Sequence, residues 1–196
     1  MVMSVHTLLQ YRDASVVYFD TEQKFSTKRL LEIAKHRMLS NLGRTTEYNL
    51  QEMMRRIHLI KATSAMDLFK SIQRLEGLIA ESDVRLIVVD SIAALARRDF
   101  NSDEIPQRQA LLVRKASILK YYAGTYNIPV LTTNQASQHT RSFVTPALGN
   151  SWSHSVNTRV RRVYHLGVII LLLLAIAGKK RREILADNQI SSGRRT

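Results

Sequence analysis

The chain has 196 residues, of which 45% are hydrophobic and 23% charged, as in a single globular domain with a substantial core. It contains no cysteine, which excludes a disulfide scaffold and a thiolate metal site. The net charge of +13 favours a polyanionic partner, either nucleic acid or an anionic membrane surface.

The first half of the chain alternates short apolar segments with amphipathic ones. Residues 16–19 are β-branched and aromatic and predict a strand, and residues 57–60 predict a second. Between them, apolar residues at helical spacing predict a helix capped by Ser26 or Thr27. Residues 40–52 are polar and are expected to form a loop or a frayed helix.

The same alternation continues through the middle of the chain. Ser64 and Asp67 have the spacing of a capping box and predict a helix whose apolar face extends to Ile79. Residues 86–89 form an apolar run, as in a strand covered on both faces, and further patterns predict a helix over 107–126 and a strand over 130–133. Strands separated by helices of this length indicate a largely parallel sheet, and hence an α/β domain.

The end of the chain breaks this pattern. Residues 159–196 carry nine basic and two acidic side chains, so much of the positive charge could belong to this tail. Residues 160–163 are expected to interrupt any further strand, and the apolar run 166–177 predicts one buried strand or helix. That run is well short of the roughly 20 residues that span a bilayer, so a membrane segment is not favoured. Residues 179–182 form a basic cluster, read either as a nuclear-localisation signal or as a commonplace basic flank.

Polar side chains follow three of the predicted strands. Asp20 and Glu22 follow the first, Asp90 the third, and Asn134 with Gln135 the fourth. Each alone is equally a helix cap or a turn residue, but the carboxyl ends of parallel strands share one edge of a sheet, where ligands bind. Four apolar residues ending in Asp are also the pattern of a Walker B strand, whose Asp holds Mg²⁺, often through water.

Four segments of the sequence resemble the eukaryotic RecA-like recombinases. They are residues 17–30 with their Asp-Thr-Glu and Phe-Ser groups, 86–91, 131–135 and, as the most specific, 147–159. The last segment resembles the B-paralogue branch of that family. The resemblance covers about residues 11–159. It implies a RecA-like α/β ATPase core, a mostly parallel sheet flanked by helices, incomplete at its N-terminal (Walker A) side.

The resemblance also implies two regions and a set of roles. Residues 1–159 would be a partial core and residues 160–196 a divergent basic and apolar tail. Asp90 would hold Mg²⁺ indirectly, Glu22 would activate water, and Gln135 would sense the terminal phosphate. These three residues are therefore the predicted catalytic and cofactor-binding groups, with ATP and Mg²⁺ as the cofactors.

Two further segments are predicted to face DNA. Arg97 and Arg98 follow the Walker B strand and are candidate phosphate contacts, although they could equally be a solvated pair of charges. His139 and Arg141 lie in the predicted second DNA-binding loop, beside Phe143. A basic and aromatic composition suits single-stranded DNA, but Phe143 could instead anchor the loop from below.

One part of the family pattern is missing. The phosphate-binding loop has the pattern G-x-x-x-x-G-K-[ST], but the only glycine followed by lysine is Gly178, and Lys180 comes next. The resemblance implies that the chain starts inside the helix after this loop. Residues 1–10 have no basic start followed by an apolar block, so no secretory signal is expected. We therefore expect very weak nucleotide binding and no meaningful hydrolysis by this chain alone.

The leading hypothesis is an impaired recombinase paralogue in homologous-recombination repair. It would act in the nucleus and bind single- and double-stranded DNA and other paralogues, the C paralogue first among them. Three alternatives stay open: an active ATPase whose missing loop belongs to a longer isoform, a membrane-associated protein held by residues 166–177, and an inert truncated product.

Overall fold

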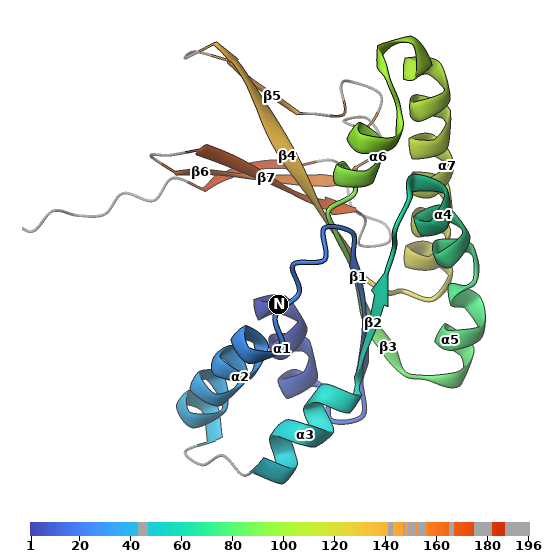
Figure 1. The fold of residues 1–196 in the computed structure, drawn as a ribbon. Coiled ribbons are helices and arrows are strands. Elements are labelled where there is room, and N and C mark those ends of the chain that lie inside the picture. Colours follow the sequence, from blue (N-terminus) through green and yellow to red (C-terminus); the bar gives the residue numbers. More distant parts are fainter. Residues whose placement is uncertain are drawn as a thin grey trace, which may run out of the picture.

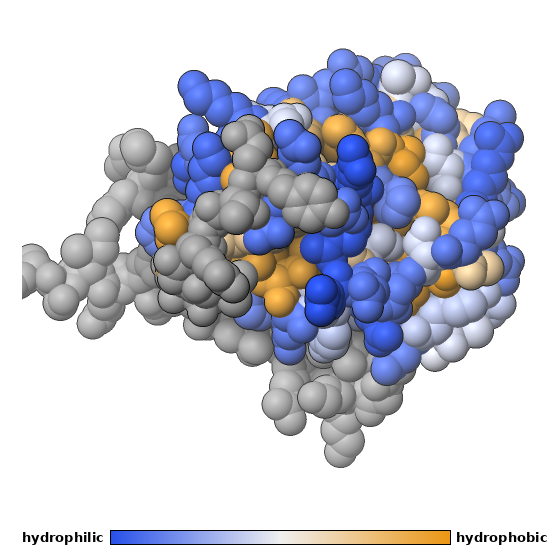
Figure 2. All heavy atoms as spheres, turned by 90° about the horizontal axis from the view of Figure 1, so that it is seen from below, coloured by the Kyte–Doolittle hydropathy of each residue, from blue (hydrophilic) through white to orange (hydrophobic). Residues whose placement is uncertain are grey.

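The protein is an α/β structure with helices on both faces of one sheet (Figure 1). The computed structural model describes residues 1–42, 47–140, 143–146, 148, 152, 156–164, 167–174 and 182–186. Side chains are described within 1–39, 49–134, 148, 152 and 156–158. The face seen from below is mostly hydrophilic, with apolar patches between the polar side chains (Figure 2).

Four parallel strands form the half of the sheet that carries the predicted site. Their order is β2 (Ile57–Lys61), β1 (Ser15–Asp20), β3 (Val84–Asp90) and β4 (Val130–Thr140). Beyond β4 lie β7 (Gly167–Leu174), β6 (Thr158–Tyr164) and β8 (Arg182–Ala186), while β5 (Phe143–Pro146) pairs with the far end of β4. The pairs β4–β7 and β6–β7 are antiparallel.

The helices divide between the two faces of the parallel strands. On one face lie α1 (Val2–Gln10), α2 (Thr27–Leu42) and α3 (Glu47–Arg55); on the other lie α4 (Ala65–Gln73), α5 (Leu75–Glu81) and α7 (Ile105–Thr125) (Figure 1). The short helices α6 (Ala94–Asp99) and η1 (Ser102–Glu104) connect β3 to α7.

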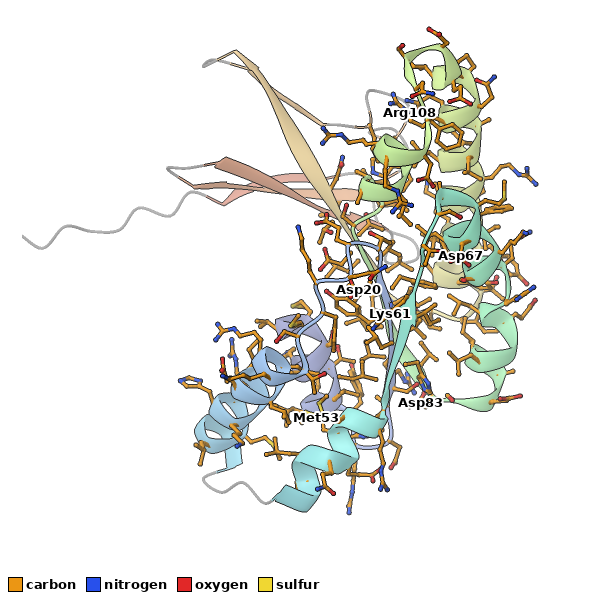
Figure 3. All side chains as sticks on the ribbon, in the orientation of Figure 1. Asp20, Met53, Lys61, Asp67, Asp83 and Arg108 are labelled. Atoms are coloured by element: carbon orange, nitrogen blue, oxygen red, sulfur yellow. The ribbon has the colours of Figure 1, made fainter. Side chains whose placement is uncertain are left out.

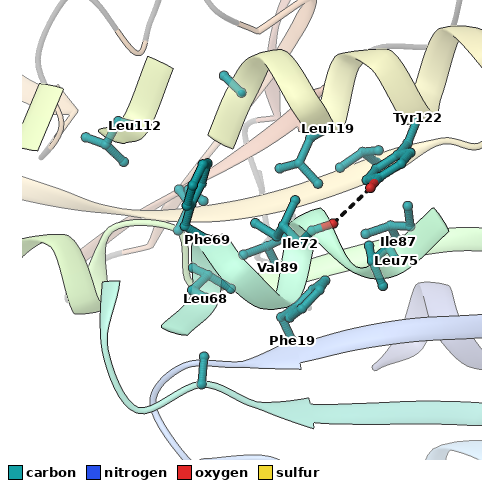
Figure 4. Packing of buried hydrophobic residues seen from close by; sticks show 14 of the residues in the cluster. Phe19, Leu68, Phe69, Ile72, Leu75, Ile87, Val89, Leu112, Leu119 and Tyr122 are labelled. Atoms are coloured by element: carbon teal, nitrogen blue, oxygen red, sulfur yellow. Dashed lines mark hydrogen bonds between the residues drawn. The ribbon is translucent and has the colours of Figure 1, made fainter. Parts of the chain in front are cut away.

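Alternation along each strand separates two hydrophobic cores. Phe19 and Val89 pack with Ile72 and Leu119 in the core under α4 and α7 (Figure 4). Tyr18, together with Val16 of the same strand and Leu86 and Val88 of β3, packs in the opposite core under α1, α2 and α3. Both faces of these strands are therefore covered, which explains why their sequences are almost continuously apolar.

The four predicted strands of the parallel half and the helix over 107–126 are confirmed. The predicted α/β fold with a mostly parallel, helix-flanked sheet is confirmed with them. Ser26 caps α2, because its Oγ accepts a hydrogen bond from the Arg29 amide at 3.2 Å. Ser64 likewise accepts from the Asp67 amide at 3.0 Å, at the start of α4.

The polar segment 40–52, expected as a loop or a frayed helix, is partly helical: α2 ends at Leu42, and α3 begins at Glu47 because Leu50 and Met53, three residues apart, are buried in the core beneath it. One local expectation is wrong. The helix expected from Ser64 to Ile79 is two helices that meet at Arg74. The Tyr122 hydroxyl donates to the carbonyl oxygens of Ile72 and Gln73, both at 3.1 Å, which satisfies backbone groups that a continuous helix would pair internally.

The expected interruption at residues 160–163 is also wrong, because β6 runs through them. The strand is supported on both sides, by β7 and by β8. Of the two structures considered for the apolar run, the strand is the one present, as β7. Among the described helices none has the length and apolar character to cross a membrane. The division of the chain at residue 159 stays a prediction.

Candidate functional site

The ends of β1, β3 and β4 meet at one edge of the sheet. Asp20 and Asp90 are register partners in the parallel β1–β3 pair. Val89 pairs with Thr132, which places Thr133 beside Asp90. Figure 3 shows Asp20 at the end of β1, next to Lys61 at the end of β2. The carboxyl edge predicted as the site is therefore a real row of polar residues.

Both oxygens of the Asp90 carboxylate accept hydrogen bonds from hydroxyl groups. The Tyr18 hydroxyl donates to Oδ2 at 2.5 Å, and the Thr133 hydroxyl donates to Oδ1 at 2.6 Å. Burial and the bond to Asp90 raise the pKa of Tyr18 far above its ordinary value, so the phenol keeps its proton and remains a donor. The half-buried Asp90 is thus an oriented acid with two neutral donors.

A second set of bonds fixes the ends of β1 and β3 to each other. The Thr21 amide donates to the carbonyl oxygen of Asp90 at 2.9 Å. The Thr21 hydroxyl donates to the carbonyl oxygen of Ser91 at 2.8 Å and accepts from the Ser91 amide at 2.7 Å. Thr21 therefore sets the position of the chain immediately after Asp90.

Asp20 has a structural role in the loop between β1 and α2. Its buried carboxylate accepts from the amides of Lys24 and Phe25, at 3.1 and 2.9 Å. Backbone amides are good partners for a buried carboxylate, because they replace the water that the charge loses on burial. These two bonds fold the loop that carries Glu22.

Glu22 lies in that loop, two residues beyond β1. Its Oε2 is 2.6 Å from the ammonium group of Lys24, and the hydrogen bond raises the pKa of Lys24. The Glu22 side chain is only 21% exposed, whereas that of Lys24 is 77% exposed. Glu22 also lines an open pocket of about 340 Å³ between this loop and α6, bordered by Ala94, Leu95 and Arg98 among others.

The predicted DNA-contacting residues lie in different environments. Arg97 and Arg98 are exposed in the last turn of α6. The Arg98 guanidinium donates to the carbonyl oxygen of Thr63 and, at 2.9 Å, to Oδ1 of Asp99. The other oxygen of Asp99 accepts from the Ala65 amide at 2.5 Å, so this group joins α6 to the start of α4.

Three predicted site residues are described in part or not at all. Gln135 lies on β4, two residues after Thr133, and His139 lies further along the same strand. The side chains of both lie outside the described residues, as does Arg141. The structure therefore brings Asp90 and the β4 backbone together, with Glu22 in the adjoining loop.

The hydroxyls of Tyr18, Thr21 and Thr133 were missed by the sequence analysis as site residues. Tyr18 was counted only as part of an apolar strand and Thr133 only as a strand residue. The position of Tyr18 in the sequence could have indicated its role. It precedes Asp20 by two residues on the same face of β1, and its register partner is Val88, two residues before Asp90.

The sequence and the described structure fit ATP and Mg²⁺ only in part. The Asp90 carboxylate could hold a hydrated magnesium ion, but the 196 residues contain no Gly-rich loop with its lysine to hold a triphosphate. No group of three or more His, Cys, Asp or Glu side chains that could hold a metal occurs within the described part of the chain. The sequence therefore contains no phosphate-binding loop to accompany the Asp90 carboxylate.

A parallel sheet covered on both faces, with an acidic residue at the carboxyl end of a central strand, is consistent with a RecA-like α/β core. The family model described as Rad51 matches residues 6–164. The chain belongs to the Rad51 family.

Three curated relatives carry the name DNA repair protein RAD51 homolog 2. The human protein is 32% identical over 201 residues, which covers 88% of this chain and 49% of that protein. The mouse protein is 32% identical over 213 residues, covering 94% of this chain and 57% of the relative. The Arabidopsis thaliana protein is 30% identical over 174 residues, which covers 76% of this chain and 45% of that protein.

The predicted resemblance to the recombinases and to their B paralogue is confirmed. The chain spans about half the length of the curated relatives it matches.

Proposed function

We propose that this chain is a recombinase paralogue subunit that acts in homologous-recombination repair in the nucleus, with an impaired ATP site. It would bind single- and double-stranded DNA and other paralogues, the C paralogue first among them. The observation that carries the proposal is the Asp90 carboxylate, oriented by Tyr18 and Thr133 at the edge of a Rad51-family core whose sequence has no phosphate-binding loop.

The nucleotide part of the proposal assigns three roles. Asp90 would hold Mg²⁺ through water, Glu22 would activate the attacking water, and Gln135 would sense the terminal phosphate. Without the loop, the backbone amides and lysine that stabilise the phosphates are absent, and these interactions supply most of the binding and much of the catalysis in such sites. We therefore expect very weak ATP binding and no meaningful hydrolysis.

Titration with a fluorescent ATP analogue and Mg²⁺ tests this part. The expected result is no saturation in the micromolar range for the wild-type chain and for Asp90→Asn alike. Micromolar affinity that is lost in Asp90→Asn would contradict the impaired site, because it would show that the described acid contributes to a working nucleotide pocket.

The DNA part of the proposal assigns phosphate contacts to Arg97, Arg98, His139 and Arg141. Such contacts release counterions, so affinity should fall steeply as salt rises. Arg97→Gln is the variant to test, because replacing Arg98 would also remove the hydrogen bonds that join α6 to Thr63 and Asp99. We expect weaker binding of single-stranded DNA by Arg97→Gln, measured by fluorescence anisotropy. An affinity that does not change with salt would contradict the proposal.

A second candidate function is an active ATPase in a longer isoform. The retained Asp90 and Glu22, and the coverage of only 49% of the human relative, favour it. Sequencing the full transcript separates the two candidates, because the active form requires a G-x-x-x-x-G-K-[ST] segment ahead of the segment that corresponds to α1.

A further inference from the structure

The exposed sides of α2 carry a concentration of positive charge. Lys28, Arg29, Lys35, His36 and Arg37 are all exposed. The only acidic residue of the helix is Glu32, whose carboxylate is 2.9 Å from Arg29. Among the described residues, Lys28, Lys35 and Arg37 form no ion pair. Within the described part of the chain, no acidic side chain pairs with these three cations of the helix.

Packing fixes this orientation of the helix. Leu30, Ala34 and Met38 follow one another at four-residue spacing and are at most 4% exposed, in the core shared with α1 and β1. That stripe anchors one side of α2, so the lysine and arginine positions on the remaining sides must face solvent. The backbone positions of these charged residues are therefore fixed by packing and do not depend on a loop.

A hollow adjoins the helix where it meets α1. It has a volume of about 400 Å³ and is lined by Val2, Arg29, Glu32, Ile33, His36 and Arg37. Lys28 and Lys35 lie two turns apart on one side of α2, about 10 Å along its axis. Arg37 lies on the side of the hollow. The charges thus cover a broad surface of the helix.

We propose that this α2 surface, defined by Lys28, Arg29, Lys35 and Arg37, binds the phosphate backbone of duplex DNA. Duplex DNA carries one charge per about 1.7 Å of its axis, so a surface about 10 Å long faces several phosphates. The surface lies on the face of the sheet opposite α4 and α7 (Figure 1) and is separate from the segments after β3 and β4. A membrane is a weaker fit, because the apolar stripe of α2 is buried in the core and cannot insert into lipid.

The test compares two triple variants of the full chain that lose equal charge. Lys28→Gln with Lys35→Gln and Arg37→Gln removes the cations of the α2 surface. Lys70→Gln with Arg74→Gln and Lys120→Gln removes three exposed cations of α4, its C-cap and α7, on the other side of the sheet. The probe is a labelled duplex of about 25 base pairs, with affinities measured between about 50 and 200 mM salt.

We expect the α2 variant to bind at least about tenfold more weakly and to lower the slope of log affinity against log salt by about 2 to 3, as for the loss of three phosphate contacts. The control variant should change both much less. Equal weakening of the two variants would overturn the proposal, because net charge alone would then explain it, and so would no weakening of the α2 variant. Melting temperatures of both variants equal to that of the wild type would show that misfolding does not cause the loss of binding.

Two further measurements distinguish duplex binding by the α2 surface from the DNA contacts of the proposed function and from a membrane contact. If Arg97→Gln weakens binding but the α2 variant does not, the α2 surface is refuted while the DNA contacts of the proposed function survive. If the α2 variant loses binding to vesicles of phosphatidylserine and phosphatidylcholine but keeps its affinity for the duplex, the surface is a membrane contact and the proposal is wrong.

Discussion

The hydroxyl of Tyr18 donates a 2.5 Å hydrogen bond to Asp90, across the adjacent strands β1 and β3 and over 72 positions of sequence. The Thr133 hydroxyl completes the arrangement from β4. The acid that resembles the magnesium-associated residue of the family is therefore oriented by side chains from two other strands. The orientation of the Asp90 carboxylate depends on the strand register, so a change of register should also displace the carboxylate.

Replacing Tyr18 with Phe should destabilise the fold by about 1–3 kcal/mol, because a bond to a charged group is lost and Oδ2 of Asp90 is left without that donor. The free energy of unfolding in urea measures the change. Tyr126→Phe is the matched control: its hydroxyl donates to exposed Glu76 at 2.8 Å, so it should cost less than about 1 kcal/mol. Equal losses of stability in the two variants would show that the Tyr18 hydrogen bond stabilises the fold no more than an exposed one does.

Asp20 and Glu22 should differ in how much each contributes to the stability of the fold. Asp20→Ala leaves the amides of Lys24 and Phe25 without their acceptor and should destabilise the protein by about 1–3 kcal/mol. Glu22→Gln removes the ion pair with a largely exposed lysine and should cost less than about 1 kcal/mol. Thermal melts of both variants check this. A larger loss for Glu22→Gln would mean that its role is structural.

The fold was largely predictable because the central strands are buried on both faces. Residues 86–89 are apolar without a break, and that signal does not depend on the rest of the chain. The segment that forms α3 was left open between a loop and a frayed helix because its sequence is mostly polar; among its described side chains, Leu50 and Met53 are the ones buried in the core. β6 was missed for a different reason, because its arginines obscure a strand whose pairing with β7 and β8 stabilises it.

The candidate site was predictable only as a list of residues. Asp90 was found because a buried strand that ends in an acid is a local pattern. Its partners were not, since Thr133 is 43 positions away and reaches Asp90 only through the register of β3 and β4. The structural role of Asp20 likewise appears only when the loop that follows β1 is folded back onto its carboxylate.

Tyr122 should stabilise the junction of α4 and α5. Its hydroxyl serves the carbonyl oxygens of Ile72 and Gln73, and Figure 4 shows the first of these bonds. Tyr122→Phe keeps the ring in the core but leaves the two carbonyl oxygens without this donor, which should cost about 1–2 kcal/mol. Hydrogen exchange should show faster opening at the end of α4 than at the middle of α7. Unchanged protection there would contradict the assigned role.

Lys115 makes stability depend on pH. The side chain is 0% exposed in the core under α7, and its ammonium group has no hydrogen-bond partner among the described residues. Burial lowers its pKa from 10.5 to about 8, against the opposing effect of the negative charge on Asp99. Between these two values the unfolded chain binds more protons than the folded one, so stability should rise with pH through this range.

Below pH 8 the charged lysine is buried at a cost of about 3 kcal/mol relative to the unfolded chain. Lys115→Met should therefore stabilise the protein at pH 7 by about 2–3 kcal/mol, and this advantage should shrink towards pH 10 as the wild-type lysine enters the fold uncharged. Urea unfolding at several pH values measures the difference in free energy of unfolding between the variant and the wild type. The titration of other groups is common to both proteins and cancels in this difference. Lys120→Met, exposed on the same helix, should show no such trend. A constant difference between Lys115→Met and the wild type across this range would mean that the ammonium group reaches water or an anion in the folded protein.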